Sequence, residues 1–186
     1  MLEVRSPLSY EEFLSIREET RDKTELIDGV LYVTPAPARI HQLALLRTVR
    51  AFDSHFVRCG GGQLFFSPFD VRFAIATVVQ PDMLVVLDDR AYILDEDPVV
   101  EAPSIAIEIL SPSNSRYDLV IKRDLYALYG VPEYWIADPA AQTVTVMTNP
   151  VDGRYQSVVT SLDVATSVYV PEVSISIEDL FSPYYP

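Results

Sequence analysis

The sequence predicts a mixed α/β fold in which helices flank a central mixed β-sheet. Apolar residues recur at helical spacing over about residues 40–58 and 116–129, and short apolar runs of strand-like composition lie between and after them. The order strand, helix, strand between Ser104 and Ala137 predicts a right-handed crossover. We therefore expect the strands at 104–110 and 133–137 to be parallel.

The N-terminal elements carry local signals. Ser9 followed by Glu12 forms a capping box, which predicts that a short helix begins here. Asp28-Gly29 separates two apolar runs, and this dipeptide is typical of a β-hairpin turn. The two prolines in residues 35–37 then predict a connection that is not helical.

A long helix is predicted over residues 40–58, and the glycines that begin at Gly60 end it. Its expected apolar stripe is Leu43, Leu46, Val49, Phe52 and Phe56. Strand-like runs, a polar acidic loop and another strand follow in turn, at residues 63–66, 69–73 and 78–87, then 88–100, then 104–110.

A second helix is predicted over residues 116–129. The serine-rich residues 111–115 supply its N-cap, and Gly130 and Pro132 prevent it from continuing. Its expected apolar stripe is Tyr117, Ile121, Leu125 and Leu128. The chain then predicts a buried strand at 134–137, further strands at 143–147, 155–159 and 167–170, and a helical turn at 177–181.

Length and composition favour a globular protein. The 186 residues suit one domain, 1–186, and 49% hydrophobic with 22% charged residues exclude a disordered chain. No apolar run approaches the roughly 18 residues that a membrane span needs, and the N-terminus lacks a basic start and an apolar signal core. Cys59 is the only cysteine, so no intrachain disulfide can form and we expect a cytoplasmic protein.

The formal net charge of −13 limits how this chain could bind nucleic acid. Such binding draws on neutralisation of phosphates by lysine and arginine, so it would require a local basic surface or metal ions. The basic concentrations are Arg39, Arg47, Arg50 and Arg58 on the first long helix and Arg116, Lys122 and Arg123 on the second. A solvated helix face explains the first group equally well.

Two carboxylates interrupt apolar strands. Asp82 follows Pro81 within the run 78–87, and Glu108 lies in the middle of Ile-Ala-Ile-Glu-Ile-Leu. An ionised carboxylate in such surroundings is costly unless it is paired or binds a metal. Mg²⁺ commonly uses one or two carboxylates and completes its shell with water and substrate phosphate. Lys122 on the following helix would add a positive charge near the phosphate.

Each of these residues also has a purely structural explanation. Asp82 after a proline could satisfy a bulge at a strand start, and Glu108 could belong to a buried ion pair. Lys122 could pair with Asp118, four residues earlier, on a solvated helix face. A general acid–base pair acting on a glycosidic bond is a further alternative for the two carboxylates, but a nearby lysine counts against it.

Four motifs in order resemble one known family, and they span about residues 9–181. They are Glu-Leu-Ile-Asp-Gly at 25–29, Val-Gln-Pro-Asp at 79–82, Ile-Glu-Ile-Leu-Ser-Pro-Ser at 107–113, and Lys122–Tyr129 followed by Gly-Val-Pro-Glu-Tyr-Trp at 130–135. The chain resembles the Uma-type putative restriction endonuclease family. This family belongs to the PD-(D/E)XK nuclease superfamily, was formerly a domain of unknown function and is common in cyanobacteria. The resemblance implies a restriction-endonuclease-like core with a metal at the edge of its sheet.

The resemblance also implies roles for particular residues. Asp82 is similar to the PD aspartate and Glu108 to the acidic residue of the (D/E)XK half, while Leu110 stands where that pattern expects lysine. Lys122 resembles the lysine that this branch carries on the following helix, and Glu25 resembles an early glutamate that completes the metal site. His41 stands where the family often has a histidine, although a histidine at a helix start is more often a cap or solvent-facing.

The expected function is hydrolysis of DNA by a Mg²⁺- or Mn²⁺-dependent endonuclease. Asp82, Glu108 and Glu25 would hold the metal, and Lys122 would position water or stabilise the transition state. The alternative is an inactive nuclease-fold module that binds nucleic acid or protein in a defence or mobile-element system. Because cleavage of both strands calls for two sites, a homodimer is expected.

Overall fold

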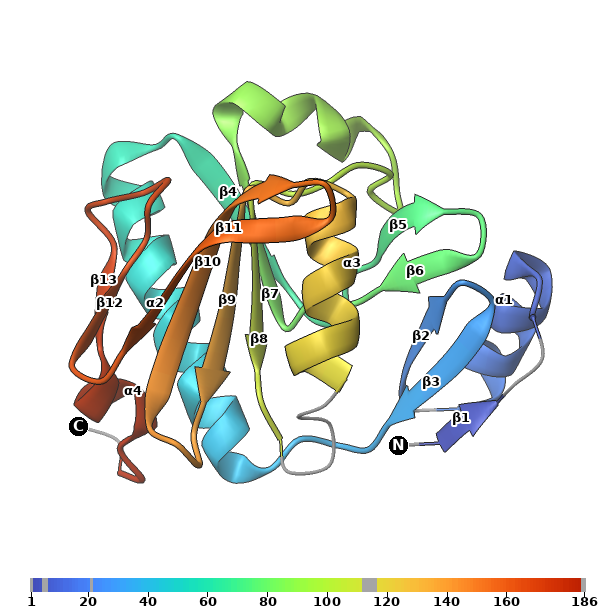
Figure 1. The fold of residues 1–186 in the computed structure, drawn as a ribbon, viewed down its shortest axis with the longest axis horizontal. Helices are drawn as coiled ribbons and strands as arrows, with labels where there is room; N and C mark the ends of the chain where they lie inside the picture. Colours follow the sequence, from blue (N-terminus) through green and yellow to red (C-terminus); the bar gives the residue numbers. More distant parts are fainter. Residues whose placement is uncertain (1, 5–6, 21, 112–116, 185–186) are drawn as a thin grey trace.

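The computed structural model describes residues 2–4, 7–20, 22–111 and 117–184 (Figure 1). Its α-helices are α1 (Tyr10–Glu19), α2 (Arg39–Cys59), α3 (Arg123–Leu128) and α4 (Ile177–Phe181). Its strands are β1 (Leu2–Val4), β2 (Lys23–Ile27), β3 (Val30–Thr34), β4 (Gly62–Phe66), β5 (Val71–Ala74), β6 (Thr77–Val79), β7 (Met83–Leu87), β8 (Ile105–Ile109), β9 (Glu133–Asp138), β10 (Thr143–Val151), β11 (Arg154–Ser161), β12 (Val164–Thr166) and β13 (Ser174–Ser176).

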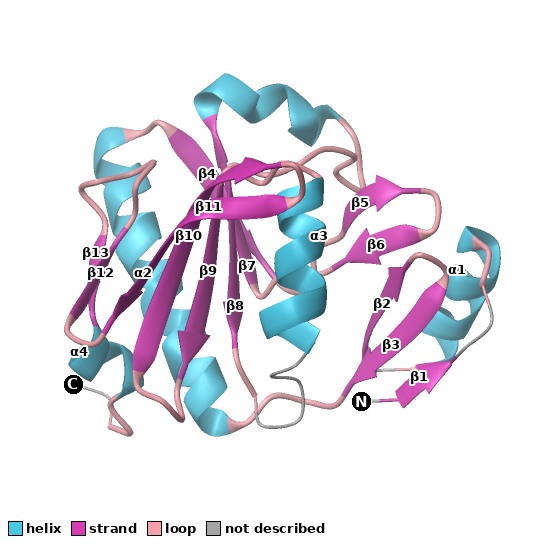
Figure 2. Ribbon diagram, viewed as in Figure 1, coloured by secondary structure: helices cyan, strands magenta, loops and turns pink. Residues whose placement is uncertain are grey.

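The larger sheet has the strand order β11-β10-β9-β8-β7-β4 (Figure 2). Strands β8 and β9 are parallel, with Ile107 opposite Trp135, and every other neighbouring pair in this sheet is antiparallel. The predicted parallel pairing across the crossover is therefore confirmed, and so is a mixed central sheet flanked by helices.

Alternating side chains of β7 and β8 enter two separate hydrophobic cores. Leu84 and Ala106 pack with residues of α3 on one face, whereas Met83 and Ile107 pack with residues of α2 on the other. This partition follows from the period of two along a strand, by which successive side chains point to opposite faces. Both faces of the sheet are thus covered, which explains why β7 and β8 are nearly continuous apolar runs.

The smaller sheet has the order β1-β3-β2-β6-β5, and α1 packs against it (Figure 1). The predicted hairpin is confirmed: β2 and β3 are antiparallel, and the two turn residues Asp28 and Gly29 have φ angles of 50° and 77°. Two positive φ values define the type I′ turn that aspartate and glycine favour. The capping box of α1, formed by Ser9 and Glu12, is also confirmed.

The run 78–87 is not one strand, as the sequence predicted, but two strands in different sheets. The break falls at Gln80-Pro81-Asp82, between β6 of the smaller sheet and β7 of the larger one. Proline has no amide hydrogen to donate to a strand neighbour, so it favours a break in the ladder at this point. Asp82 therefore lies just before a strand and at the junction of the two sheets.

The apolar face of α2 is rotated from the predicted stripe. Ala44, Thr48 and Phe52 are fully buried against the sheet, whereas Leu46 is 39% exposed. The small side chains of Ala44 and Thr48 leave room for the helix to lie close to the sheet. The larger side chain of Leu46 lines a cavity instead.

The second predicted helix begins at Tyr117, within the described residues, and its first turn is π-helical over Tyr117–Lys122. Residues 112–116, which include most of the predicted N-cap, lie outside the described residues. Leu128 was expected in the apolar stripe but is 66% exposed. A π turn spaces its hydrogen bonds five residues apart, so positions counted at 3.6 residues per turn from Tyr117 no longer share one face.

Two further predictions about loops are wrong. The acidic segment predicted as a loop contains a 3₁₀ helix, Asp88–Asp95. Residues 167–170, predicted as a strand, do not form one. Residues 168–170 form bends, because the carboxylate of Glu133 accepts hydrogen bonds from the amides of Val168 and Tyr169 at 2.8 and 2.9 Å. The last small sheet is instead made by β12 and β13, and the terminal helical turn is confirmed as α4. Within the described ranges, no helix has the length and apolar character to cross a membrane.

Candidate active site

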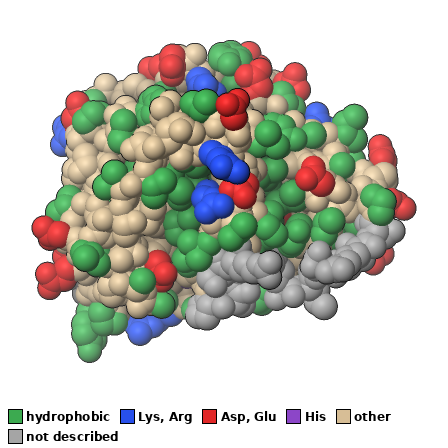
Figure 3. Space-filling view, viewed as in Figure 1, with side chains coloured by type: hydrophobic (Ala, Val, Ile, Leu, Met, Phe, Trp, Pro, Cys, Tyr) green, Lys and Arg blue, Asp and Glu red, His purple; other side chains and the backbone are tan. Residues whose placement is uncertain are grey.

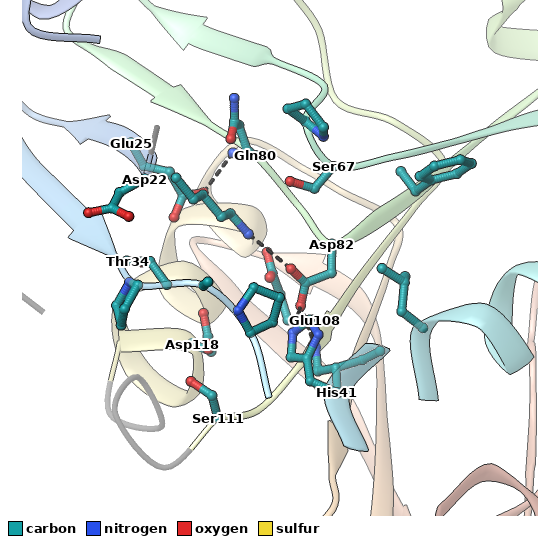
Figure 4. A pocket seen from close by; sticks show the side chains of 18 of the residues that line it. Asp22, Glu25, Thr34, His41, Ser67, Gln80, Asp82, Glu108, Ser111 and Asp118 are labelled. Atoms are coloured by element: carbon teal, nitrogen blue, oxygen red, sulfur yellow. Dashed lines mark hydrogen bonds and ion pairs between the residues drawn. The ribbon is translucent and has the colours of Figure 1, made fainter. Parts of the chain in front are cut away.

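A cavity of about 590 Å³ lies where the two sheets meet. Its walls come from β2, from the N-terminal half of α2, from the junction before β7, from the end of β8 and from the π-helical segment. Figure 4 shows Glu25, Asp82 and Glu108 turned toward this cavity. All four residues that the sequence predicted for the site, Glu25, Asp82, Glu108 and Lys122, line it.

Asp82 is fixed by three donors from three different elements. Its Oδ2 accepts a hydrogen bond from the Ile109 amide at 2.9 Å and contacts Nε2 of His41 at the same distance. Its Oδ1 accepts from the ammonium group of Lys23, also at 2.9 Å. Burial by itself would raise the pKa of Asp82, but the charge of Lys23 and the hydrogen bond with His41 lower this pKa well below its usual range. The carboxylate is therefore ionised.

Glu108 is 1% exposed and accepts two hydrogen bonds on one oxygen. Lys122 Nζ donates to its Oε1 at 2.6 Å, and the Tyr126 hydroxyl donates to the same atom at 2.8 Å. Burial raises the pKa of Glu108, while the positive charge of Lys122 opposes that rise. Of the structural explanations considered from the sequence, the buried ion pair of Glu108 is present, whereas Asp82 contacts Lys23 and His41.

Lys122 is 1% exposed, which excludes the solvated ion pair with Asp118 considered from the sequence. Its Nζ lies 2.8 Å from Oε1 of Glu25 and 2.6 Å from Oε1 of Glu108, so it joins a strand of each sheet. Burial alone would lower the pKa of Lys122, but the charges of Glu108 and Glu25 raise it above its ordinary value. The lysine therefore stays charged inside the protein.

Glu25 is the anchor for this lysine. Its Oε1 also accepts the Gln80 amide at 2.6 Å, and its Oε2 accepts the Tyr117 hydroxyl at 3.0 Å. Tyr117 and Lys122 are five residues apart, a separation that would place them about 140° apart around an α-helix. The π turn brings both side chains to the same carboxylate. This irregular turn is therefore part of the architecture of the site.

His41 is buried rather than solvent-facing, contrary to the more common role expected of a histidine at a helix start. It is 8% exposed, and its Nε2 contacts Asp82 while its Nδ1 has no hydrogen-bond partner. The resemblance to the family had pointed to this position. Lys23, Tyr117 and Gln80 were not predicted. For Lys23 a signal was present, since Lys23 and Lys122 are the only two lysines of the chain.

The arginines of α2 do not form a basic patch at the cavity. Arg47 donates to the backbone oxygens of Leu180 and Ser182 at 3.1 and 2.7 Å, and Arg39 donates to that of Pro183 at 3.3 Å. These side chains hold the C-terminal segment against the helix. Arg116 lies outside the described residues. Figure 3 shows few Lys and Arg side chains among the described residues on the face in view.

The cavity has the chemistry of a hard-cation site, although in this structure its carboxylates accept hydrogen bonds and ion pairs from groups of the protein. Carboxylate oxygens are the ligands that Mg²⁺ and Mn²⁺ prefer, and Glu25, Asp82 and Glu108 supply them, with the unpartnered Nδ1 of His41 nearby. Within the described residues, no three His, Cys, Asp or Glu side chains form a preassembled metal cluster. The ammonium groups of Lys23 and Lys122 form ion pairs with these three carboxylates instead.

The fold and the cavity define a nuclease-fold protein, and comparisons with known proteins identify its family. The family model Uma2, described as a putative restriction endonuclease, matches residues 10–178. The chain therefore belongs to this family. A crystal structure from Anabaena variabilis, described as a putative nuclease belonging to DUF820, superposes with a TM-score of 0.77 at 26% identity and covers 94% of this chain and 98% of that one.

A curated relative adds no functional information. An uncharacterised protein of Synechocystis sp. is 30% identical in an alignment of 123 residues that covers 64% of this chain. The chain spans 62% of the length of that relative. The family and the neighbouring structure thus support a nuclease, and they leave the chemistry of the site to be argued from its residues.

Proposed function

We propose that the protein is a metal-dependent endonuclease that hydrolyses DNA phosphodiester bonds. The observation that carries this proposal is the convergence of Glu25, Asp82, Glu108 and Lys122, all at most 6% exposed, in one cavity of a nuclease fold. Buried charges of this density are costly for a scaffold and cluster at functional sites.

Asp82 and Glu108 are the proposed ligands of Mg²⁺ or Mn²⁺. The Ile109 amide and His41 hold the Asp82 carboxylate in its orientation, and Tyr126 does the same for Glu108. A divalent metal held there would supply Lewis acidity toward a phosphate oxygen and toward a bound water. The sequence also predicted Glu25 as a ligand. Its contacts with Lys122, Tyr117 and Gln80 support a role in holding the lysine.

Lys122 is the proposed group that orients water or stabilises charge on the phosphate. Its ammonium has three hydrogens and remains charged, and it lies 5.4 Å from the centre of the Tyr117 ring. Two carboxylates and this ring restrict its position before substrate arrives. Such preorganisation lets a charge act on the transition state without reorganisation during the reaction.

Cleavage of both strands would need a second site, which a homodimer would supply. Cys59 is the only cysteine, so no intrachain disulfide calls for an oxidising compartment, and this supports action in the cytoplasm. The net charge of −13 means that binding of DNA depends more on the metal than on a general positive field.

A supercoiled-plasmid nicking assay in Mg²⁺ or Mn²⁺ tests the proposal. Glu108→Gln keeps the shape of the side chain and removes its charge, and we expect it to lower the nicking rate by about 100-fold or more. Asp152→Asn is the matched control, because Asp152 is exposed in the β10–β11 turn at φ 49°, a conformation that asparagine accepts. Equal nicking by all three proteins would refute the assignment.

The same assay, together with a gel-shift measurement of DNA binding, separates the nuclease from an inactive binding module. If the wild-type protein binds DNA but does not nick it with either metal, the binding module would be the better account. The net charge of −13 and the engagement of Arg39 and Arg47 by the C-terminal segment weaken binding of nucleic acid, so they favour the form of this alternative in which the module binds protein.

A further inference from the structure

The chain has only two lysines, and both ammonium groups lie among the site carboxylates. Of its 14 basic residues, Lys23 and Lys122 are the lysines, and the remaining 12 are arginines. Lys23 comes from β2 and contacts Asp82, 59 residues away, whereas Lys122 contacts Glu25 and Glu108. The remaining Lys or Arg positions all carry arginine, so these two positions differ from the rest of the chain.

The two lysines are held very differently. Lys122 has a side chain only 1% exposed, and two carboxylates contact its ammonium group. Lys23 has a side chain 20% exposed, and Asp82 is the acidic group with which its ammonium forms an ion pair. Lys23 lines the cavity and is the more exposed of the two lysines, so displacing it from Asp82 disturbs less buried side chain than displacing Lys122 would.

Lys23 covers the Asp82 oxygen that a metal would need. The other oxygen, Oδ2, is taken by the Ile109 amide and by His41, both at 2.9 Å. Oδ1 is contacted by Lys23 at 2.9 Å. An ammonium group on a flexible four-carbon stem is a compact positive charge that can exchange with a cation, which the planar guanidinium of arginine does less readily.

We propose that Lys23 is a built-in competitor cation, which neutralises Asp82 in the metal-free protein and is displaced when a divalent metal binds. The inference rests on the proposed function, because it concerns the same carboxylate. It accounts for two observations together, the absence of a preassembled metal cluster in the described part of the chain and the partial exposure of Lys23. The apparent metal affinity is then the intrinsic affinity multiplied by the fraction of molecules in which Lys23 has left Asp82.

Nuclear magnetic resonance of the wild-type protein tests displacement directly. Labelling with ¹³C,¹⁵N-lysine yields signals from two side chains, which Lys23→Arg assigns. On titration with Mg²⁺, we expect the Lys23 ε-methylene signal to shift toward that of a free, solvent-exposed lysine. A Lys23 signal that stays in place at saturating Mg²⁺ would overturn the inference, and this test needs no destabilising substitution.

Calorimetric titration with Mn²⁺ alone gives an independent measurement. We expect Lys23→Met to bind Mn²⁺ about tenfold more tightly than the wild type, because the competing charge is gone. The control is Arg154→Met, which lowers the net charge equally from an exposed position on β11 and should stay within about twofold of the wild type. Thermal melting verifies that each variant is folded.

The outcomes distinguish this inference from the proposed function. Equal Mn²⁺ affinity of the wild type and Lys23→Met would overturn the competitor role and leave a metal-dependent nuclease intact. Binding by Lys23→Met that is tighter than that of the wild type supports the competitor role even if neither protein nicks DNA. Absence of Mn²⁺ binding in both proteins would overturn the metal-dependent function and this inference together.

Discussion

Replacement of Lys122 by methionine is the most direct test of the buried ion network. The substitution keeps the length of the side chain but removes the charge that lies 2.8 Å from Glu25 and 2.6 Å from Glu108. Both carboxylates are 1% exposed, so solvent screens the lost positive charge poorly. Removal of one partner from a buried pair costs about 3–5 kcal/mol, because the remaining charge is left uncompensated.

The effect of Lys122→Met should depend on pH. Lys122 stabilises the ionised form of Glu108, and burial already raises the pKa of Glu108 above its ordinary value of 4.5. Protonation of Glu108 relieves part of the uncompensated charge in the variant. The loss of stability should therefore be largest near pH 8 and should shrink as the pH falls toward the ordinary range of a glutamate.

Urea unfolding at pH 8 and at pH 5, followed by circular dichroism, measures this loss. With an m-value of about 2 kcal/mol/M, a cost of about 3–5 kcal/mol lowers the midpoint by about 1.5–2.5 M. Adding Glu108→Gln to Lys122→Met should restore part of the stability, since it removes one unpaired charge. A loss below about 1 kcal/mol that is equal at both pH values would refute the buried network.

Three further predictions concern stability. Burial raises the pKa of Asp118 far above its usual value, so the ionised carboxylate destabilises the folded protein as the pH rises through that pKa. Asp118→Asn should therefore raise the melting temperature at pH 8 but not at pH 4. An equal effect at both pH values would contradict this explanation. Gly29→Ala should cost about 1–3 kcal/mol in urea unfolding, because φ is +77° and a Cβ would meet Pro7 at 3.0 Å. Gly153→Ala shares the positive φ but has nothing nearer than 3.8 Å, so a cost as large as that of Gly29→Ala would exclude the contact with Pro7 as a cause. Ser9→Ala removes the N-cap of α1 and should cost about 1 kcal/mol; an unchanged urea midpoint would contradict the cap.

Much of the fold could be predicted from short segments of sequence. The capping box at Ser9, the turn at Asp28-Gly29 and the termination of α2 at Gly60 are all present in the structure. Each depends on interactions within about four residues, which the sequence displays directly. The parallel pairing of β8 and β9 was also predictable, because a single crossover helix joins them.

The errors arose where contacts distant in sequence overrode local pattern. Residues 78–87 have the composition of one strand, but Pro81 interrupts the run, and the parts before and after it pair in different sheets. Leu128 falls at helical spacing when counted from Tyr117, but the π turn over Tyr117–Lys122 lies between the two residues and rotates Leu128 off that face. Residues 167–170 would suit a strand, yet Glu133 takes two of their amides.

The composition of the site was predictable, and its internal connections were not. Glu25, Asp82, Glu108 and Lys122 could be selected because charged residues in apolar runs and the order of motifs identify them. The partner of each charge could not, since Lys23 meets Asp82 across 59 residues and Tyr117 meets Glu25 across 92. The metal-binding and catalytic roles of the four residues selected from the sequence stay predictions.

The sequence by itself therefore determined the kind of fold, most of its elements, and the charged residues that would need a partner. Only the tertiary structure decided that the two lysines lie on three carboxylates and that one of them, Lys23, is partly open to solvent. The physical reason is the separation along the chain of the residues that interact. Turns, caps and strand alternation are encoded by neighbours along the chain, whereas an ion pair at the junction of two sheets depends on how those sheets pack.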